Sequence, residues 1–119
     1  MRMDREAGRG GATRTVLKLR PRPGLSGAVI ELFRREGIID RALLVDGCHR
    51  VEIWQGADEL LVVGTWADAG AYQAWLEHPA RSANNDELDA LLLVPVEASS
   101  PGGLFELALS GGGSGGEQS

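Results

Sequence analysis

Large aromatic rings and two basic side chains gather in one short stretch of this chain. Two of the three Trp residues and the single Tyr fall between Trp66 and Trp75, and His78 and Arg81 follow directly. An apolar strand is expected to lead into Trp66, and a helix that starts at an Asp is expected to follow it. Rings gathered at such a corner can enclose a cavity, and His and Arg can move a proton or hold an anion there. We therefore expect the binding cavity at this corner.

The three aromatic residues have different candidate roles. Trp66 closes a buried strand and is expected to form a wall of the cavity and to contact a substrate ring. Tyr72 and Trp75 stand three positions apart, so they lie on one side of their helix. The Tyr72 hydroxyl could then hydrogen-bond a phenol or a carbonyl group. The alternative is that all three rings only pack the core.

Two histidines and an arginine are the polar candidates. His78 is the best general base, because the ordinary pKa of His is about 6.5. Its alternative role is an exposed cation at the C-terminus of a helix. His49 lies on the apolar face of an alternating strand, where it would be a core residue or would face the cavity. Arg81 could clamp an anionic substrate oxygen, or form a surface ion pair of little energetic weight.

Hydrophobic periodicity and turn residues predict the elements that hold these groups. One helix is expected between Ser26 as its N-cap and Gly37 just beyond its end, and a second over 68–77. Strands are expected at 14–20, 48–54, 59–65 and 91–97, with a short addition at 104–109. This order predicts an α+β, ferredoxin-like fold, in which an antiparallel β-α-β-β-α-β sheet carries both helices on one face.

The other face of that sheet would remain bare. If Val62 and Trp66 point toward the helices, then Leu61 and Val63 point away from them. Such apolar side chains are unfavourable in water, and a second copy of the chain is the simplest cover. We therefore expect a homodimer.

Composition limits the function classes. The 119 residues allow one domain, predicted at 13–109 between a flexible arm at 1–12 and a flexible Gly/Ser tail at 110–119. A net charge of −5 and a pI near 5.0 argue against nucleic acid as a partner. No apolar window reaches about 18 residues, so no membrane span is expected. A lone Cys48 and a charged start without a secretory signal favour the cytoplasm.

No pattern points to a metal or a cofactor. The chain has only two His, far apart in sequence, and no carboxylate stands at ligand spacing from either. No glycine-rich loop joins a strand to a helix, so flavin and nicotinamide binding have no support. We expect neither a metal site nor a cofactor.

The chain resembles the antibiotic biosynthesis monooxygenase family of dimeric α/β-barrel proteins over roughly 13–109. The resemblance rests on the element order, on the Pro23-Gly24 opening before the first helix, on Asp46-Gly47-Cys48, and on a longer signature. That signature is Trp66-Ala67-Asp68-x3-Tyr72-x2-Trp75-x2-His78-Pro79. It implies a ferredoxin-like fold that dimerises into an α/β barrel. It implies activity less sharply, because the family also contains polyketide cyclases, isomerases and haem-degrading oxygenases.

The resemblance departs from the family at one position that matters for mechanism. Cofactor-free oxygenases of the family pair the strand-end Trp, here Trp66, with an Asn four residues earlier, where this chain has Val62. An isopropyl group cannot polarise a phenolate, so Asn84, Asn85 or Arg50 would have to replace the amide. The haem-degrading members need an iron-ligating His where this chain has Asn85, so haem cleavage is not implied.

These residues suggest three candidate functions. The first is a cofactor-independent monooxygenase that acts on a quinol, an anthrone or a polyketide-like aromatic. In it, His78 or His49 would take the phenolic proton, and Trp66 with Tyr72 would orient the ring. The second is a non-redox polyketide cyclase or isomerase in the same pocket, and the third is a non-catalytic dimer that binds a small molecule. The remaining residues expected to line the substrate site are Trp75, Arg81, His49, Val62 and Asn85.

Overall fold

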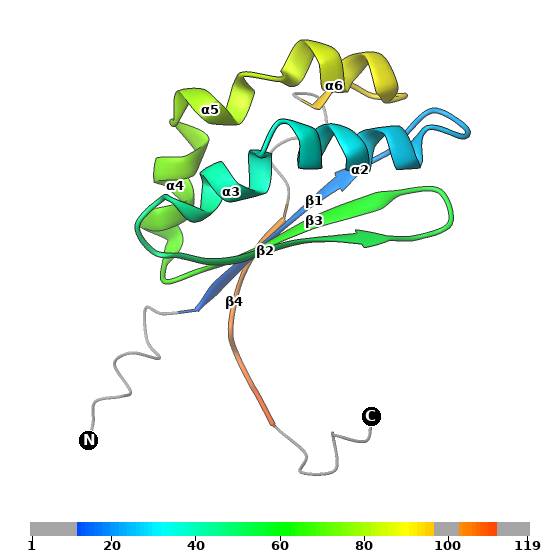
Figure 1. Ribbon diagram of the computed structural model, residues 1–119. Helices are drawn as coiled ribbons and strands as arrows, with labels where there is room; N and C mark the ends of the chain where they lie inside the picture. The colour runs from blue at the N-terminus through cyan, green and yellow to red at the C-terminus, as the bar shows by residue number, and fades with distance from the viewer. Residues whose placement is uncertain (1–11, 97–102, 112–119) are drawn as a thin grey trace, which may run out of the picture.

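The structure is a computed structural model that describes residues 12–96 and 103–111. Four antiparallel strands form one sheet in the order β2-β3-β1-β4, and all helices lie against one face of it (Figure 1). The strands are β1 (Thr13–Leu19), β2 (Cys48–Gln55), β3 (Leu60–Trp66) and β4 (Gly103–Glu106). The helices are α2 (Ser26–Arg35), α3 (Ile38–Leu43), α4 (Ala69–Leu76), α5 (Pro79–Ser82) and α6 (Asn85–Leu91). The ferredoxin-like α+β prediction is confirmed.

The register between β1 and β3 decides which side chains meet under the helices. Thr15 lies opposite Gly64, and Leu17 lies opposite Val62. Residues that face each other across antiparallel strands project from the same side of the sheet. These pairs line the cavity described below, on the side of the sheet that the helices cover. The intervening pair, Val16 and Val63, therefore lies on the open face.

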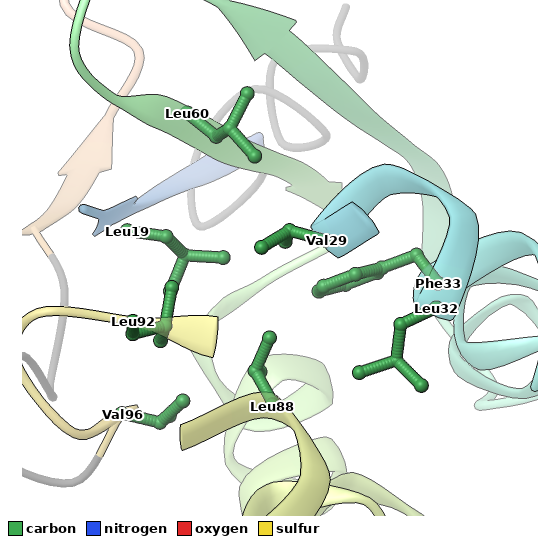
Figure 2. Packing of buried hydrophobic residues seen from close by; sticks show 8 residues of the cluster. All are labelled: Leu19, Val29, Leu32, Phe33, Leu60, Leu88, Leu92 and Val96. Atoms are coloured by element: carbon green, nitrogen blue, oxygen red, sulfur yellow. The ribbon is translucent and has the colours of Figure 1, made fainter. Parts of the chain in front are cut away.

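The main core fills the space between the sheet and helices α2 and α6. Leu19 from β1 and Leu60 from β3 meet the apolar side of α2 and the inner side of α6 (Figure 2). Each large apolar side chain buried in this way contributes about 1.5–3 kcal/mol. The buried members are Leu19, Val29, Leu32, Phe33, Leu60, Leu88, Leu92 and Val96. This cluster fixes the two helices that flank the cavity.

The predicted strand at 91–97 is wrong for the residues that the structure describes. Helix α6 runs through Leu91, and Leu92 makes only an isolated bridge with Pro21. The leucines at 88, 91 and 92 follow helical spacing, and Asp86 with Glu87 supplies the negative charge that favours a helix start. The apolar run was interpreted as a strand, but its first residue, Leu91, ends α6, and the described residues that follow it make only the bridge at Leu92. The fourth strand is β4, which overlaps the short addition predicted at 104–109.

Helix boundaries agree with the predictions in part. Ser26 is the first residue of α2 rather than its cap, and Leu25 occupies the N-cap position without a side-chain hydrogen bond. Helix α3 was not predicted at all. By contrast, Asp68 caps α4 as expected, and α4 ends before Pro79 as expected. No helix within 12–96 and 103–111 is long and apolar enough to cross a membrane. The predicted arm at 1–12 and the predicted tail at 110–119 lie outside the described residues except for residues 12, 110 and 111.

Candidate functional site

A cavity lies between the helix-covered face of the sheet and the helical layer. Its volume is about 90 Å3. A single bound water needs about 10–15 Å3 of such volume. The cavity therefore has room for several waters that a ligand could displace. Its lining residues are Thr15, Leu17, Phe33, Ile38, Ile39, Ala42, Val51, Val62, Gly64, Trp66, Tyr72, Trp75, Arg81, Asn84, Asn85, Leu88 and Val96.

The three predicted aromatic residues all line this cavity. Trp66 is only 2% exposed at the end of β3, and its ring centroid lies 5.3 Å from that of Tyr72, with the planes tilted by 59°. Trp75 is buried on the same helix as Tyr72. The Asp68 carboxylate accepts a hydrogen bond of 2.9 Å from the Ala71 N–H, which fixes the start of that helix. The sequence signature therefore brings its rings together, as predicted.

Polar groups enter the cavity from the helical layer. Arg81 comes from α5, Asn84 from the position before α6, and Asn85 from the first turn of α6. The Asn84 amide oxygen accepts a hydrogen bond of 3.2 Å from the Arg41 guanidinium, which also donates to the Glu36 carbonyl. Arg41 therefore holds this part of the lining in place. Arg81 and Asn85 are at the cavity, as the sequence predicted.

The Tyr72 hydroxyl is a proton donor at neutral pH. Burial raises the pKa of Tyr72 above its ordinary value, and the nearby positive charge of Arg81 acts in the opposite direction. Tyr72 and Arg81 both line the cavity. A protonated phenol beside a cation can bind a substrate oxygen that carries negative charge.

Neither histidine lines the cavity, which corrects the expectation that one of them would face it. His49 is exposed because the pairing of β2 with β3 shifts register between Cys48 and Arg50, and this irregularity breaks the alternation that predicted an inward side chain. His78 is exposed after the end of α4, and its ring stacks on Trp75 with 5.8 Å between centroids. The prediction that His78 and Trp75 lie on the same side of the helix is confirmed. The prediction that the His78 side chain points into the cavity is wrong.

Val62 lines the cavity where the related oxygenases carry Asn, and its neighbour across the strand pair is Leu17. Of the polar replacements considered, Asn84 and Asn85 reach the cavity. Arg50 does not, and it pairs instead with Glu52 at 3.2 Å.

Thr15 and Gly64 also line the cavity, and neither was predicted as a site residue. Thr15 could have been found, because it lies on the strand face that also carries Leu17 and Leu19, where a hydroxyl is a polar group among apolar side chains.

No group of three or more potential metal-binding side chains occurs within residues 12–96 and 103–111. The aromatic cavity, with Trp66, Tyr72, Trp75 and Arg81 in its lining, is the candidate site.

The family model for antibiotic biosynthesis monooxygenases matches residues 14–85, which is more than half of the chain. The chain belongs to this family. The matched segment includes β1 from its second residue on, the rings of the cavity, Arg81 and both asparagines. No curated protein matches the sequence.

Solved structures of the same fold come from several organisms. SnoaB, a cofactor-independent oxygenase from Streptomyces nogalater, is 17% identical and superposes with a TM-score of 0.65, covering 84% of this chain and 96% of its own. A Mycobacterium tuberculosis protein is 19% identical with a TM-score of 0.62, covering 87% and 99%. A conserved protein from Methanosarcina mazei is 16% identical with a TM-score of 0.64, covering 87% and 95%. At these identities the likeness shows the fold alone.

The titration of Tyr72 tests the cavity electrostatics directly, since it is the only Tyr in the chain. We expect the tyrosinate absorbance at alkaline pH to appear with a midpoint above 10.0, because burial favours the neutral phenol. Arg81→Gln should raise the midpoint further by removing a positive charge. The stability that this shift contributes is present below pH 10 and is lost as the pH rises through the folded-state pKa.

Circular dichroism over the same pH range serves as the control that the protein is still folded. A midpoint below 10.0 in folded protein, or a lower midpoint in Arg81→Gln, would contradict the placement of Tyr72 beside Arg81 in a buried site.

Proposed function

We propose that this protein is a cofactor-independent monooxygenase whose substrate is a quinol, an anthrone or a related polyketide-like aromatic. The observation that carries the proposal is a cavity walled by Trp66, Tyr72 and Trp75, with Arg81 at its polar side. Membership of the antibiotic biosynthesis monooxygenase family supports the reaction class. The fold shared with SnoaB is consistent with it.

The reaction is balanced without an added reductant. An anthrone CH2 group becomes a ketone, one atom of O2 enters the product and the other leaves as water. The substrate first loses a proton, and the resulting anion passes an electron to O2. The two radicals combine to a peroxide, whose O–O bond breaks as water departs. A cavity that excludes bulk water protects these intermediates.

The cavity residues act mainly by stabilising the substrate anion. The lining contains no carboxylate and no imidazole among the described residues, so the departing proton passes to solvent rather than to His78 or His49. The Arg81 charge and the Tyr72 hydroxyl then favour the anionic oxygen. Trp66 and Trp75 hold the ring by contact with its faces.

A polyketide cyclase or isomerase is the second candidate, and Val62 is the observation that favours it. Val62 lines the cavity where related oxygenases carry an amide, and its side chain offers no hydrogen bond. A ring closure needs the shape of the cavity and an enolate-stabilising cation, but it does not need oxygen activation.

Oxygen uptake with a panel of anthrones and hydroquinones tests the oxygenase. Wild type should consume one O2 per ketone formed. Arg81→Gln and Tyr72→Phe should each lower kcat/KM by roughly tenfold, about 1.4 kcal/mol, because each removes stabilisation of the anion. Arg34→Gln is the matched control, since Arg34 is exposed on α2 and pairs with Glu31.

His78→Ala should retain activity, because His78 lies outside the cavity; a tenfold loss in that variant would restore His78 as the base. Conversion of a substrate under argon, in the absence of O2, would instead establish the cyclase. Uptake no faster than buffer with every compound would reject the oxygenase for that panel.

We also propose that the open face of the sheet pairs with a second copy of the chain. Val16 and Val63 form its centre, and Trp54 and Phe105 are 59% and 57% exposed in the single chain. All the helices of the described residues lie on the opposite side of the sheet (Figure 1). Apolar patches of this kind commonly mark an interface, and a stable one buries about 800 Å2 on each partner.

Light scattering after size-exclusion chromatography tests the dimer. Wild type should have twice the chain mass of 12.6 kDa, and Val63→Lys should have the mass of one chain, because a charge at the centre of the face would be desolvated. Ala28→Lys, an exposed position on α2, is the matched control and should remain dimeric. A monomeric wild type, or a dimeric Val63→Lys, would contradict this proposal.

A further inference from the structure

The floor of the cavity is built around a close approach that only glycine allows. The indole of Trp66 folds back over Gly64, so that a Cβ at position 64 would lie 2.6 Å from Trp66 Nε1 and 2.9 Å from Thr15 Oγ1. Contacts that short do not occur between real atoms of these types. Gly64 therefore permits the indole and the threonine hydroxyl to meet across the two central strands.

The indole N–H of Trp66 already donates a hydrogen bond within the protein. Trp66 Nε1 donates to Thr15 Oγ1 at 3.0 Å, in a buried environment. An indole has one polar hydrogen and no acceptor, so Trp66 has no further hydrogen bond to offer a ligand. Trp66 is thus a wall of the cavity that also orients a neighbouring group.

The Thr15 hydroxyl is the group that it orients. Thr15 is 6% exposed and lines the cavity. A hydroxyl that accepts one hydrogen bond still carries its own O–H, and acceptance from the indole strengthens that O–H as a donor. Thr15 lies opposite Gly64 and Val62 lies opposite Leu17, so Thr15 and Val62 are diagonal neighbours, with Cα atoms about 7–8 Å apart.

We propose that Thr15 is a substrate-binding residue whose hydroxyl donates to a carbonyl or phenolic oxygen, with Trp66 as the positioning residue. The proposal deepens the proposed function, on which it rests for the aromatic ligand class. The donor that Val62 cannot supply comes from the neighbouring strand. Because Arg81 and Asn85 supply polar groups from the helical layer, the cavity offers hydrogen bonds on two sides. The substrate class is therefore an aromatic ring system with an oxygen function at each of two ends.

Anaerobic calorimetry with three probes of similar shape tests this assignment without turnover. The probes are naphthalene, 1-naphthol and 1,5-dihydroxynaphthalene, which carry no oxygen, one oxygen and an oxygen at each of two ends. Wild type should bind them with increasing affinity in that order. Thr15→Val should weaken 1,5-dihydroxynaphthalene by about fivefold, as expected for one neutral hydrogen bond, and should leave naphthalene unchanged.

Two further variants separate recognition from folding. Thr15→Ser keeps the hydroxyl and should retain the wild-type preference. Gly64→Ala pushes the indole away from Thr15 and should weaken the dihydroxy probe more than naphthalene. Unchanged affinity of Thr15→Val for the dihydroxy probe, loss in Thr15→Ser equal to that in Thr15→Val, or no binding of any probe to wild type would overturn the proposal. If the protein consumes no oxygen but its preference for the dihydroxy probe depends on Thr15, the oxygenase is rejected and Thr15 remains a ligand-binding residue.

Discussion

The contact of Trp66 with Gly64 and Thr15 is the constraint on which the rest of the site depends. It joins β1 to β3 at the cavity floor and places the indole 5.3 Å from the Tyr72 ring. Tyr72 and Trp75 can then close the cavity from α4, because the Asp68 cap fixes where that helix begins. A bulkier residue at position 64 would displace the indole and with it the packing of Tyr72. Because Gly64 has no side chain, the indole can take this position, and Gly64 thus determines the shape of the aromatic wall.

The two faces of the sheet differ in what they contact. Its covered face holds the cavity, and its open face carries apolar residues such as Val16 and Val63, which alternate with the cavity residues along β1 and β3. A strand that must serve both faces leaves few positions for polar groups. In this chain the polar groups of the cavity come mainly from the helical layer, with Thr15 as the exception on the sheet. Such a division favours an apolar aromatic ligand with oxygens at its ends.

Local sequence signals predicted much of the fold and of the aromatic wall. The alternation around Thr15, the cap at Asp68 and the spacing of Tyr72 and Trp75 each depend on near neighbours, so they could be interpreted from the sequence. The failures depend on tertiary structure. The leucines near 91 suit a helix or a strand until the packing of α6 decides, and the shift beside His49 depends on pairing with β3. The hydrogen bond from Trp66 to Thr15 joins residues far apart in sequence and could not be predicted.

The indole N–H resonances offer the most direct test that the aromatic cavity binds the ligand. The chain has three Trp residues: Trp66 and Trp75 line the cavity, and Trp54 is exposed outside it and donates to Glu52. Titration of 15N-labelled protein with 1,5-dihydroxynaphthalene should shift the Trp66 and Trp75 cross-peaks and leave that of Trp54 in place. A shift confined to Trp54, or no shift at saturating ligand, would contradict the account.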